Sequence, residues 1–267
     1  MQRPFQVIII IILSLIVLIL IVKSCNKEEL ENSDIIIPES SFEQLREDDL
    51  EDYCTPNKVD DSFINKSESD NNNWPDSIYN VVRDIDYLSE IEKEVVIEHN
   101  KCRTNPHRYI KEILEPFLHS MDSKGNFVDS KGRNIMTKEG RSAVEEAINA
   151  LKKQDPLPML IPMEYLYKAA RDHCNDHGPK SLIGHGGTDG SSHHSRIKRY
   201  KSNLSGTGEN IAYGSMSGTE IVRDLIIDDG VNDRGHRENI FHNYRYIGCA
   251  YGKHSGYDVM CVIDYEM

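Results

Sequence analysis

The chain has 267 residues, and its 44 acidic and 31 basic residues give a formal net charge of −13. This acidic balance argues against a nucleic-acid partner, because proteins that bind the phosphate backbone present basic surfaces. The length is sufficient for one good-sized domain together with further segments.

The N-terminus contains the first distinct segment. Residues 7–22 form an apolar run that only Ser14 interrupts, and Arg3 precedes it. The run is longer than most signal-peptide cores, roughly 7–15 residues, and shorter than the roughly 20 residues of a membrane span. We therefore interpret residues 1–24 as either a cleaved signal peptide or an uncleaved signal anchor. Both alternatives export the acidic remainder, so we expect a secreted protein, or one held at a cell surface or in a lumen, with membrane contact only through this segment.

Six cysteines in an exported chain suggest disulfide bonds. They are Cys25, Cys54, Cys102, Cys174, Cys249 and Cys261. Lipidation at Cys25 is a further option, although Lys23 fits poorly in the required motif. Sequons at Asn65 and Asn203 are usable for N-glycosylation only in a eukaryotic secretory pathway.

Residues 25–88 are expected to form an acidic, low-complexity stalk. Between residues 26 and 72 there are 15 acidic and 4 basic residues, with polar runs such as SESDNNN. Such a segment cannot bury enough apolar surface to offset the entropy lost on ordering, so a solvated spacer is expected.

Residues 89–267 are expected to form the ordered domain. Ser89 and Glu92 have the spacing of a capping box, and Ile91, Val95 and His99 then share one face of a helix. This spacing predicts that the domain begins with a helix.

Further elements follow in chain order. A second helix is expected to begin at Pro106, and the turn-rich segment 123–134 is expected to contain a short hairpin. Helical periodicity covers the segments 137–153, 164–177 and 217–227, and strand patterns cover 244–252 and 257–265. Helices first and paired strands last predict an α+β domain.

Cys249 and Cys261 lie on the two arms of this final strand pair. Opposed positions there would satisfy disulfide geometry, so we predict a Cys249–Cys261 disulfide. Two buried free thiols are the alternative.

Four glycine-containing segments concentrate the ionisable side chains that suit a site. They place His185 in GHGGTDGSS, Glu209 in TGENIAYG, Asp228 and Asp229 in LIIDDG, and His236 in RGHREN. Two imidazoles and two carboxylates are a plausible ligand set for a divalent metal ion, most simply zinc. They suit a general acid/base cluster equally well, because a carboxylate can raise the pKa of a histidine.

His173 and His177 are separated by four residues on one predicted helix face. Such a pair can bind a metal, but no Glu follows His173 as in the HExxH motif of zinc proteases. We therefore interpret both as packed core histidines.

The chain resembles the CAP superfamily in the run LIIDDGVNDRGHRENIF and in the segments GHGGTDGSS and GENIAYG. This superfamily comprises cysteine-rich secretory, antigen-five and pathogenesis-related proteins, and its domain is also called SCP. Further parts of that domain are resembled by the segments HNKCRTNPHRYI, AARDHCNDHG, IGCAYG and MCVIDY. The variant of the motifs found here is similar to microbial and protist members. The resemblance covers roughly residues 89–267. It implies an α-β-α sandwich with a small antiparallel sheet between helical layers.

The resemblance also implies a surface cleft that often holds zinc or another divalent ion. Its residues, carried over by motif, are His185, Glu209, Asp228 and His236. The family usually has a Glu after a Trp where this chain has Asp228 and Leu225. Because Asp is one methylene shorter than Glu, Asp229 is the alternative at this position.

The preferred hypothesis for function is a binding module, exported or membrane-tethered, with this cleft as its metal site. Family resemblance alone suggests a lipid, sterol or protein partner. The alternatives are a metal-assisted hydrolase with His236 as base, and a structural surface protein without a ligand. We lean against an enzyme because no serine near the motifs has a defined base.

Overall fold

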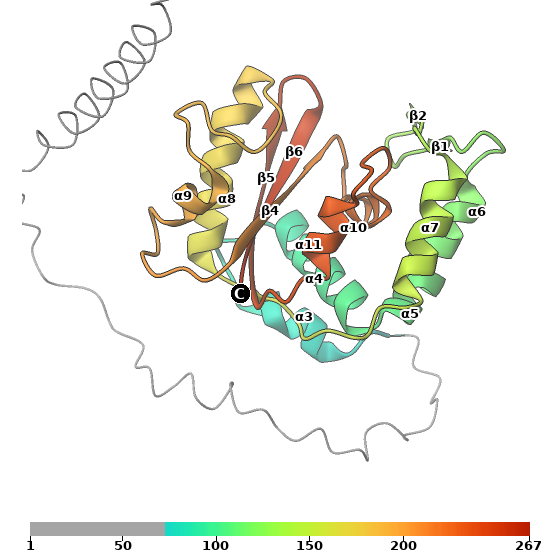
Figure 1. The fold of residues 1–267 in the computed structure, drawn as a ribbon, viewed down its shortest axis with the longest axis horizontal. Helices are drawn as coiled ribbons and strands as arrows, with labels where there is room; N and C mark the ends of the chain where they lie inside the picture. The colour runs from blue at the N-terminus through green and yellow to red at the C-terminus, as the bar shows by residue number, and fades with distance from the viewer. Residues whose placement is uncertain (1–72) are drawn as a thin grey trace, which may run out of the picture. The chain divides into compact units, whose positions relative to one another are not determined.

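The computed structural model of the protein describes residues 73–267 (Figure 1). The expected signal segment 1–24, most of the expected stalk, and Cys25, Cys54 and the Asn65 sequon lie outside the described residues. Within residues 73–267, no helix is both long enough and apolar enough to cross a membrane.

The first half of the described chain is helical, as the sequence predicts. The carboxylate of Glu92 accepts a hydrogen bond from the amide of Ser89 at 2.7 Å, so the predicted capping box is formed. The helices are α3 (Asp76–Arg83), α4 (Glu90–Thr104), α5 (Pro106–Tyr109), a π-helical turn (Ile110–Leu114), α6 (Glu115–Ser120) and α7 (Arg141–Leu151). The expected hairpin is confirmed as β1 (Phe127–Val128) paired with β2 (Asn134–Ile135).

The packed core extends further toward the N-terminus than expected. Trp74, Ile78 and Val82 are buried among the residues of the main core, and helix α3 carries two of them. The boundary predicted at residue 89 therefore falls inside the packed region. The acidic composition that suggested a stalk ends near residue 72, and the amphipathic pattern of this short helix was missed.

The second half contains the sheet and the helices beside it. The helices are α8 (Glu164–His177), a 3-10 turn (Gly178–Lys180), α9 (His193–Ile197), α10 (Gly218–Ile227) and α11 (Gly235–Ile240). The strands β3 (Ile161–Pro162), β4 (Thr207–Tyr213), β5 (Tyr246–His254) and β6 (Asp258–Glu266) form a sheet in the order β3-β5-β6-β4. Strands β4, β6 and β5 are antiparallel as expected, whereas the two-residue strand β3 runs parallel to β5.

Helices cover the two faces of this sheet. A Cβ added at Gly248 would come within 2.2 Å of the backbone nitrogen of Tyr167, so α8 packs directly on that side of β5. The neighbouring Cys249 points to the other face, where its thiol reaches the carbonyl of Glu92 in α4 at 3.3 Å. Figure 1 shows α8 and α9 on one side of the sheet and α4, α10 and α11 on the other. The predicted α-β-α arrangement is therefore confirmed.

The predicted Cys249–Cys261 disulfide is wrong for this structure. Both residues are buried free thiols, as are Cys102 and Cys174. In the β5–β6 register Cys249 lies opposite Ile263, whereas Cys261 lies opposite Tyr251. Diagonal neighbours on paired strands are about 7–8 Å apart, which exceeds the usual Cα separation of a disulfide.

Candidate functional site

The first predicted pair consists of His185 and Glu209. His185 lies in the loop that follows α8, and Glu209 lies in strand β4, which the sequence did not predict as a strand. The Nδ1 atom of His185 is 2.8 Å from Oε1 of Glu209. Because a carboxylate only accepts, Nδ1 donates, and in the neutral ring the Nε2 atom keeps its lone pair. The His185 side chain is 54% exposed and that of Glu209 is 1% exposed.

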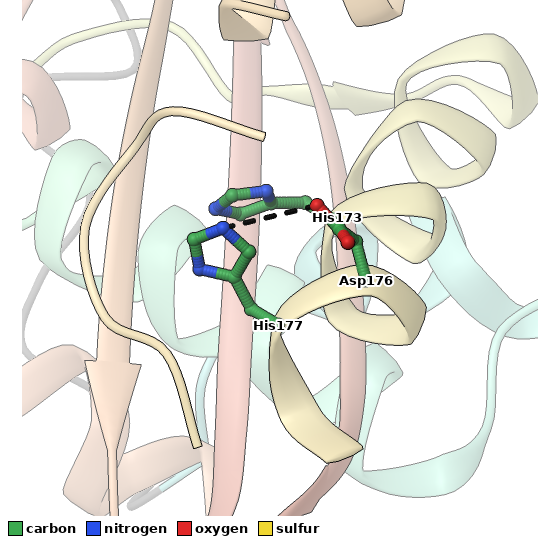
Figure 2. A group of neighbouring side chains, drawn as sticks. All are labelled: His173, Asp176 and His177. Atoms are coloured by element: carbon green, nitrogen blue, oxygen red, sulfur yellow. Dashed lines mark ion pairs between the residues drawn. The ribbon is translucent and has the colours of Figure 1, made fainter. Parts of the chain in front are cut away.

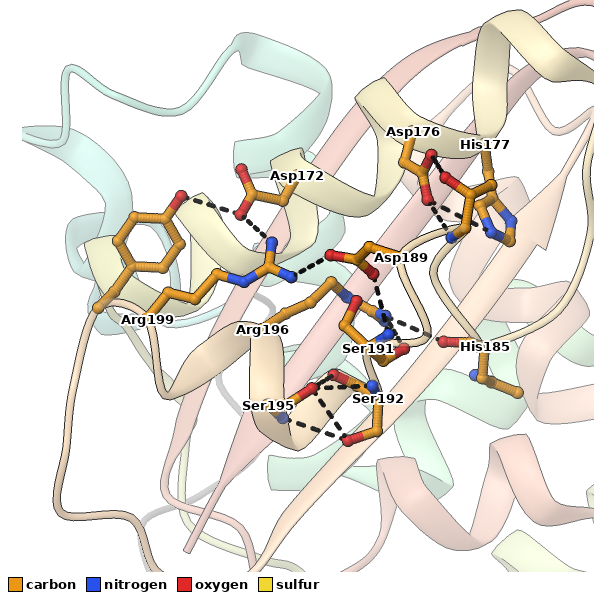
Figure 3. Close-up of polar contacts among 12 residues, drawn as sticks. Asp172, Asp176, His177, His185, Asp189, Ser191, Ser192, Ser195, Arg196 and Arg199 are labelled. Atoms are coloured by element: carbon orange, nitrogen blue, oxygen red, sulfur yellow. Dashed lines mark hydrogen bonds and ion pairs between the residues drawn. The ribbon is translucent and has the colours of Figure 1, made fainter. Parts of the chain in front are cut away.

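Arg196 of helix α9 completes the environment of Glu209. Its Nη2 donates to Oε2 of Glu209 at 2.5 Å. Its Nη1 donates to the carbonyls of His185 and Ser191 at 3.0 and 3.2 Å, as Figure 3 shows. Burial acts to raise the pKa of Glu209, but the hydrogen bond from His185 and the charge of Arg196 outweigh it and lower that pKa. Glu209 is therefore an ionised carboxylate that holds the ring of His185, whereas Arg196 holds the backbone of the same residue.

A second buried carboxyl group lies beside Glu209. Asp264 of β6 is directly opposite Glu209 in the strand register, so both side chains point toward the α8 face. Asp264 is fully buried, and burial together with the charge of Glu209 raises its pKa well above the usual range. Burial therefore favours the neutral, protonated form of Asp264 over the ionised form. Asp264 was missed because nothing in MCVIDY separates a buried acid from an exposed one.

The second predicted pair consists of Asp228 and His236. Asp228 ends helix α10 in the left-handed conformation (φ 57°), which turns its side chain back toward the start of α11. Its Oδ1 lies 2.6 Å from Nδ1 of His236, and its Oδ2 accepts the amide of His236 at 3.0 Å. The Asp228 side chain is 2% exposed and that of His236 is 26% exposed. The ring again directs Nδ1 to a buried carboxylate.

The two pairs lie on either side of the edge strand β4. Glu209 and Asn210 are consecutive in β4, so their side chains point to opposite faces of the sheet. The Asn210 amide donates to the carbonyl of His236 at 2.9 Å, and the Asn239 amide donates to the carbonyl of Glu209 at 3.3 Å. Helix α11 is thus fixed against the stretch of β4 that carries Glu209.

The four predicted residues form two pairs rather than one compact ligand cluster. Across residues 73–267, only His173, Asp176 and His177 form a group of three or more potential ligands with atoms within 4.8 Å of one another. Asp229, the alternative to Asp228, points elsewhere. Its carboxylate accepts the amides of Lys138 and Glu139 at 2.6 and 2.8 Å and so fixes the segment before α7.

The α8 histidines lie beneath the loop that carries His185. Their ring centroids are 4.0 Å apart, and Figure 2 shows the carboxylate of Asp176 at the edge of the pair. The Nε2 atoms of His173 and His177 donate to the carbonyls of Gly184 and Gly186, both at 2.8 Å. Both side chains are buried, as the core interpretation expects, and burial lowers the pKa of His173. Their Nδ1 atoms have no hydrogen-bond partner among the described residues.

The carboxylate of Asp176 is committed to the same loop. It accepts the backbone amide and the hydroxyl of Thr188 at 2.7 and 2.5 Å and is paired with Lys180. The α8 group therefore holds residues 184–188 on the helix, which positions His185. Any ion bound by this group would have to displace these contacts or use the buried Nδ1 atoms.

Part of the chain matches a known protein family. Residues 145–265 match the family model described as CAP, the cysteine-rich secretory protein family. No curated protein matches the chain significantly. The match is shorter than the resemblance expected over residues 89–267, but it includes all four predicted cleft residues.

Three solved structures are similar to the chain. An outer surface protein from Borrelia burgdorferi is 23% identical, with 49% of this chain and 95% of that one covered and a TM-score of 0.36. An extracellular protein containing a SCP domain from Bacillus anthracis is 19% identical, with a TM-score of 0.35. A cysteine-rich secretory protein from Staphylococcus aureus is 16% identical, with a TM-score of 0.33. Each of the latter two alignments covers 47% of this chain and 37% of the other. The similarity of this chain to the CAP family therefore rests on the match of residues 145–265.

Proposed function

We propose that this protein is an exported or membrane-tethered CAP-domain binding protein that binds a divalent metal ion, zinc in first place, through the Nε2 atoms of His185 and His236. The proposal is supported by one feature that the chain builds twice from unrelated segments. Each imidazole directs Nδ1 to a buried carboxylate and leaves Nε2 without a partner among the described contacts. Histidines that bind metals have this arrangement, in which a carboxylate fixes the tautomer and the ring orientation.

The proposal changes the roles expected for the two carboxylates. As Glu209 and Asp228 are 1% and 2% exposed and each is bonded to a histidine, they suit outer partners better than metal ligands. The shorter side chain of Asp228 is then no obstacle, because it needs to reach only the ring of His236. Two protein nitrogen ligands would leave the remaining positions of a tetrahedral ion to water or to a partner.

Export is supported by the apolar run 7–22 and by the family description, which names secretory proteins. Asn203 is exposed, as a glycosylated residue would have to be. A lipid, sterol or protein partner is proposed from the family alone. Partner searches should therefore compare the metal-loaded protein with the metal-free protein.

Titration calorimetry of the full chain with zinc, magnesium and calcium tests the proposal. The His185→Ala and His236→Ala variants should each lose most of the zinc affinity while remaining folded. His119→Ala is the matched control, because His119 is exposed on α6 and far in sequence from both pairs. Unchanged binding in both cleft variants would overturn the proposal. Zinc-dependent hydrolysis of an ester or peptide panel, lost in His236→Ala, would favour the hydrolase alternative.

A further inference from the structure

Two adjoining cavities are lined by no residue of the two histidine pairs. The larger has a volume of about 500 Å³ and opens between the β1–β2 hairpin, the end of β4, and the β5–β6 turn. The smaller has a volume of about 140 Å³ and extends toward α6 and α7. Both are lined by Phe127, Ile135 and Asp224, so these side chains stand at the junction between them. The hairpin wall lies outside residues 145–265, the region that matches the family model.

The larger cavity carries an excess of negative charge. Four carboxylates and two guanidinium groups line it, which leaves two net negative charges. The acids are Asp129, Glu220, Asp224 and Asp258, and the bases are Arg133 and Arg223. Both arginines are already paired within the wall, Arg133 with Asp129 and Asp258, and Arg223 with Asp224. A bound cation would consequently meet carboxylates whose charge the wall does not fully balance.

Aromatic rings line the same space. The rings of Tyr213 and Tyr257 are 5.4 Å apart, and Phe127 lies across from them on the hairpin. The protein already places one of its own cations on such rings, since the guanidinium of Arg223 lies 3.9 Å from the centre of Phe117 and 5.4 Å from that of Phe127. Aromatic faces next to carboxylates are the surroundings in which organic cations bind well.

Asp224 is the polar group at the junction. Its Oδ1 accepts from Nε of Arg223 at 2.8 Å, whereas its Oδ2 receives only the hydroxyl of Ser215 at 3.2 Å. Its side chain remains 38% accessible although it lines interior walls, because that surface faces the cavities.

The smaller cavity is almost entirely apolar. Apart from Asp224, Asp229 and Thr137, its walls are aliphatic, aromatic or glycine residues. The cavity opens to the surface beside the exposed Met136. For comparison of volume, an enclosed apolar cavity of about 150 Å³ accommodates a benzene molecule. A volume of about 140 Å³ therefore suits a single ring or a short alkyl arm.

We propose that the two cavities together form a binding site for a primary ammonium compound with one aromatic or short alkyl arm. The ammonium group would donate to Oδ2 of Asp224 in the larger cavity, and the arm would occupy the smaller one. A net negative aromatic chamber beside an apolar one supplies both kinds of contact. The site is independent of the proposed metal, because no residue of either histidine pair lines it.

Calorimetry with phenethylamine tests this proposal, using the full chain in lipid nanodiscs with a chelator present. Nanodiscs avoid free detergent, which would compete for the apolar cavity. The amine should bind, whereas 2-phenylethanol and phenylacetate, which carry the same ring without the positive charge, should bind at least about tenfold more weakly. Equal binding of the neutral alcohol, or no binding of the amine at millimolar concentration, would overturn the proposal.

Two variants with a matched control locate the binding. Asp224→Asn should weaken amine binding by about tenfold or more, and Tyr257→Ala by a few-fold, because Tyr257 is half-exposed and supplies one ring. Asp155→Asn removes the same charge from an exposed loop and should leave binding unchanged. If Asp224→Asn fails to fold, Tyr257→Ala still decides. Amine binding that is unaffected by the variants that fold would refute the site.

Discussion

Replacing Arg196 by Met is the perturbation that most sharply probes how the first pair is built. The Arg196 side chain is 2% exposed and makes three hydrogen bonds, to the carboxylate of Glu209 and to the carbonyls of His185 and Ser191. Methionine fills a similar volume but removes the charge. Glu209 would then be a buried carboxylate without the positive charge that compensates it.

The expected loss of stability is large. Removing one partner of a buried ion pair costs about 3–5 kcal/mol, because the remaining charge is left buried without compensation. For a domain of this size, such a loss corresponds to a fall in Tm of about 6–20 °C. Urea unfolding of the full chain, followed by circular dichroism, gives the change in the free energy of unfolding.

Arg199→Met is the matched control. Arg199 lies three residues away and pairs with Asp172 and Asp189, but its side chain is 41% exposed (Figure 3). Exposed ion pairs contribute about 0–1 kcal/mol, so this variant should lose less than about 1 kcal/mol. A loss below about 1 kcal/mol in Arg196→Met, or equal losses in the two variants, would refute the reasoning that burial makes the Arg196–Glu209 pair essential.

Three further predictions concern the sheet. Burial raises the folded-state pKa of Asp264, so its contribution to stability is complete below the unfolded-state value near 3.9 and is lost as pH rises toward the folded-state value. Asp264→Asn should therefore gain stability relative to the wild type as pH increases. If the difference in the free energy of unfolding between the two proteins, measured by urea unfolding, stayed the same over a pH series, this prediction would be contradicted. Gly248→Ala should lower the free energy of unfolding by about 2–3 kcal/mol or more, because the new Cβ would lie 2.2 Å from the backbone nitrogen of Tyr167. A urea midpoint equal to that of the wild type would show that the contact between α8 and β5 is looser than described. Since Cys249 and Cys261 are free thiols, a thiol-blocking reagent applied to the denatured, unreduced protein should label both in peptide mass spectra, whereas labelling only after reduction would show that they are paired.

The sequence predicted the elements whose signals are local. The capping box at Ser89 and Glu92, the hairpin near residue 128 and the final strand pair all depend on side chains close in the chain, and the structure contains them. Helix α3 was missed because eight residues give few turns of periodicity, and the acidic segment before it dominated the interpretation.

The sequence identified four candidate site residues, but it did not predict how they pair. Motif positions identified His185, Glu209, Asp228 and His236, and the structure joins them as two histidine–carboxylate pairs. The sequence cannot distinguish a carboxylate that binds a metal from one that orients a histidine, because this depends on which atoms face solvent.

The supporting groups depend on contacts between distant segments. Arg196 lies in a run of basic residues that resembles any exposed surface, yet it is buried against a strand 13 residues later. The register of β4 and β6 places Asp264 beside Glu209, and the sequence does not show this register. The disulfide prediction was wrong for the same reason, because it depended on the register of β5 and β6. A two-residue offset between paired strands places Cys249 and Cys261 on a diagonal, and only the register reveals it.

The most direct test of the central claim is an anomalous difference map from crystals of the protein loaded with zinc. We predict one peak about 2.0–2.1 Å from the Nε2 atoms of both His185 and His236, with Glu209 and Asp228 still bonded to the Nδ1 atoms. A peak bonded directly to either carboxylate, a peak at His173, Asp176 and His177, or no peak at all would contradict it.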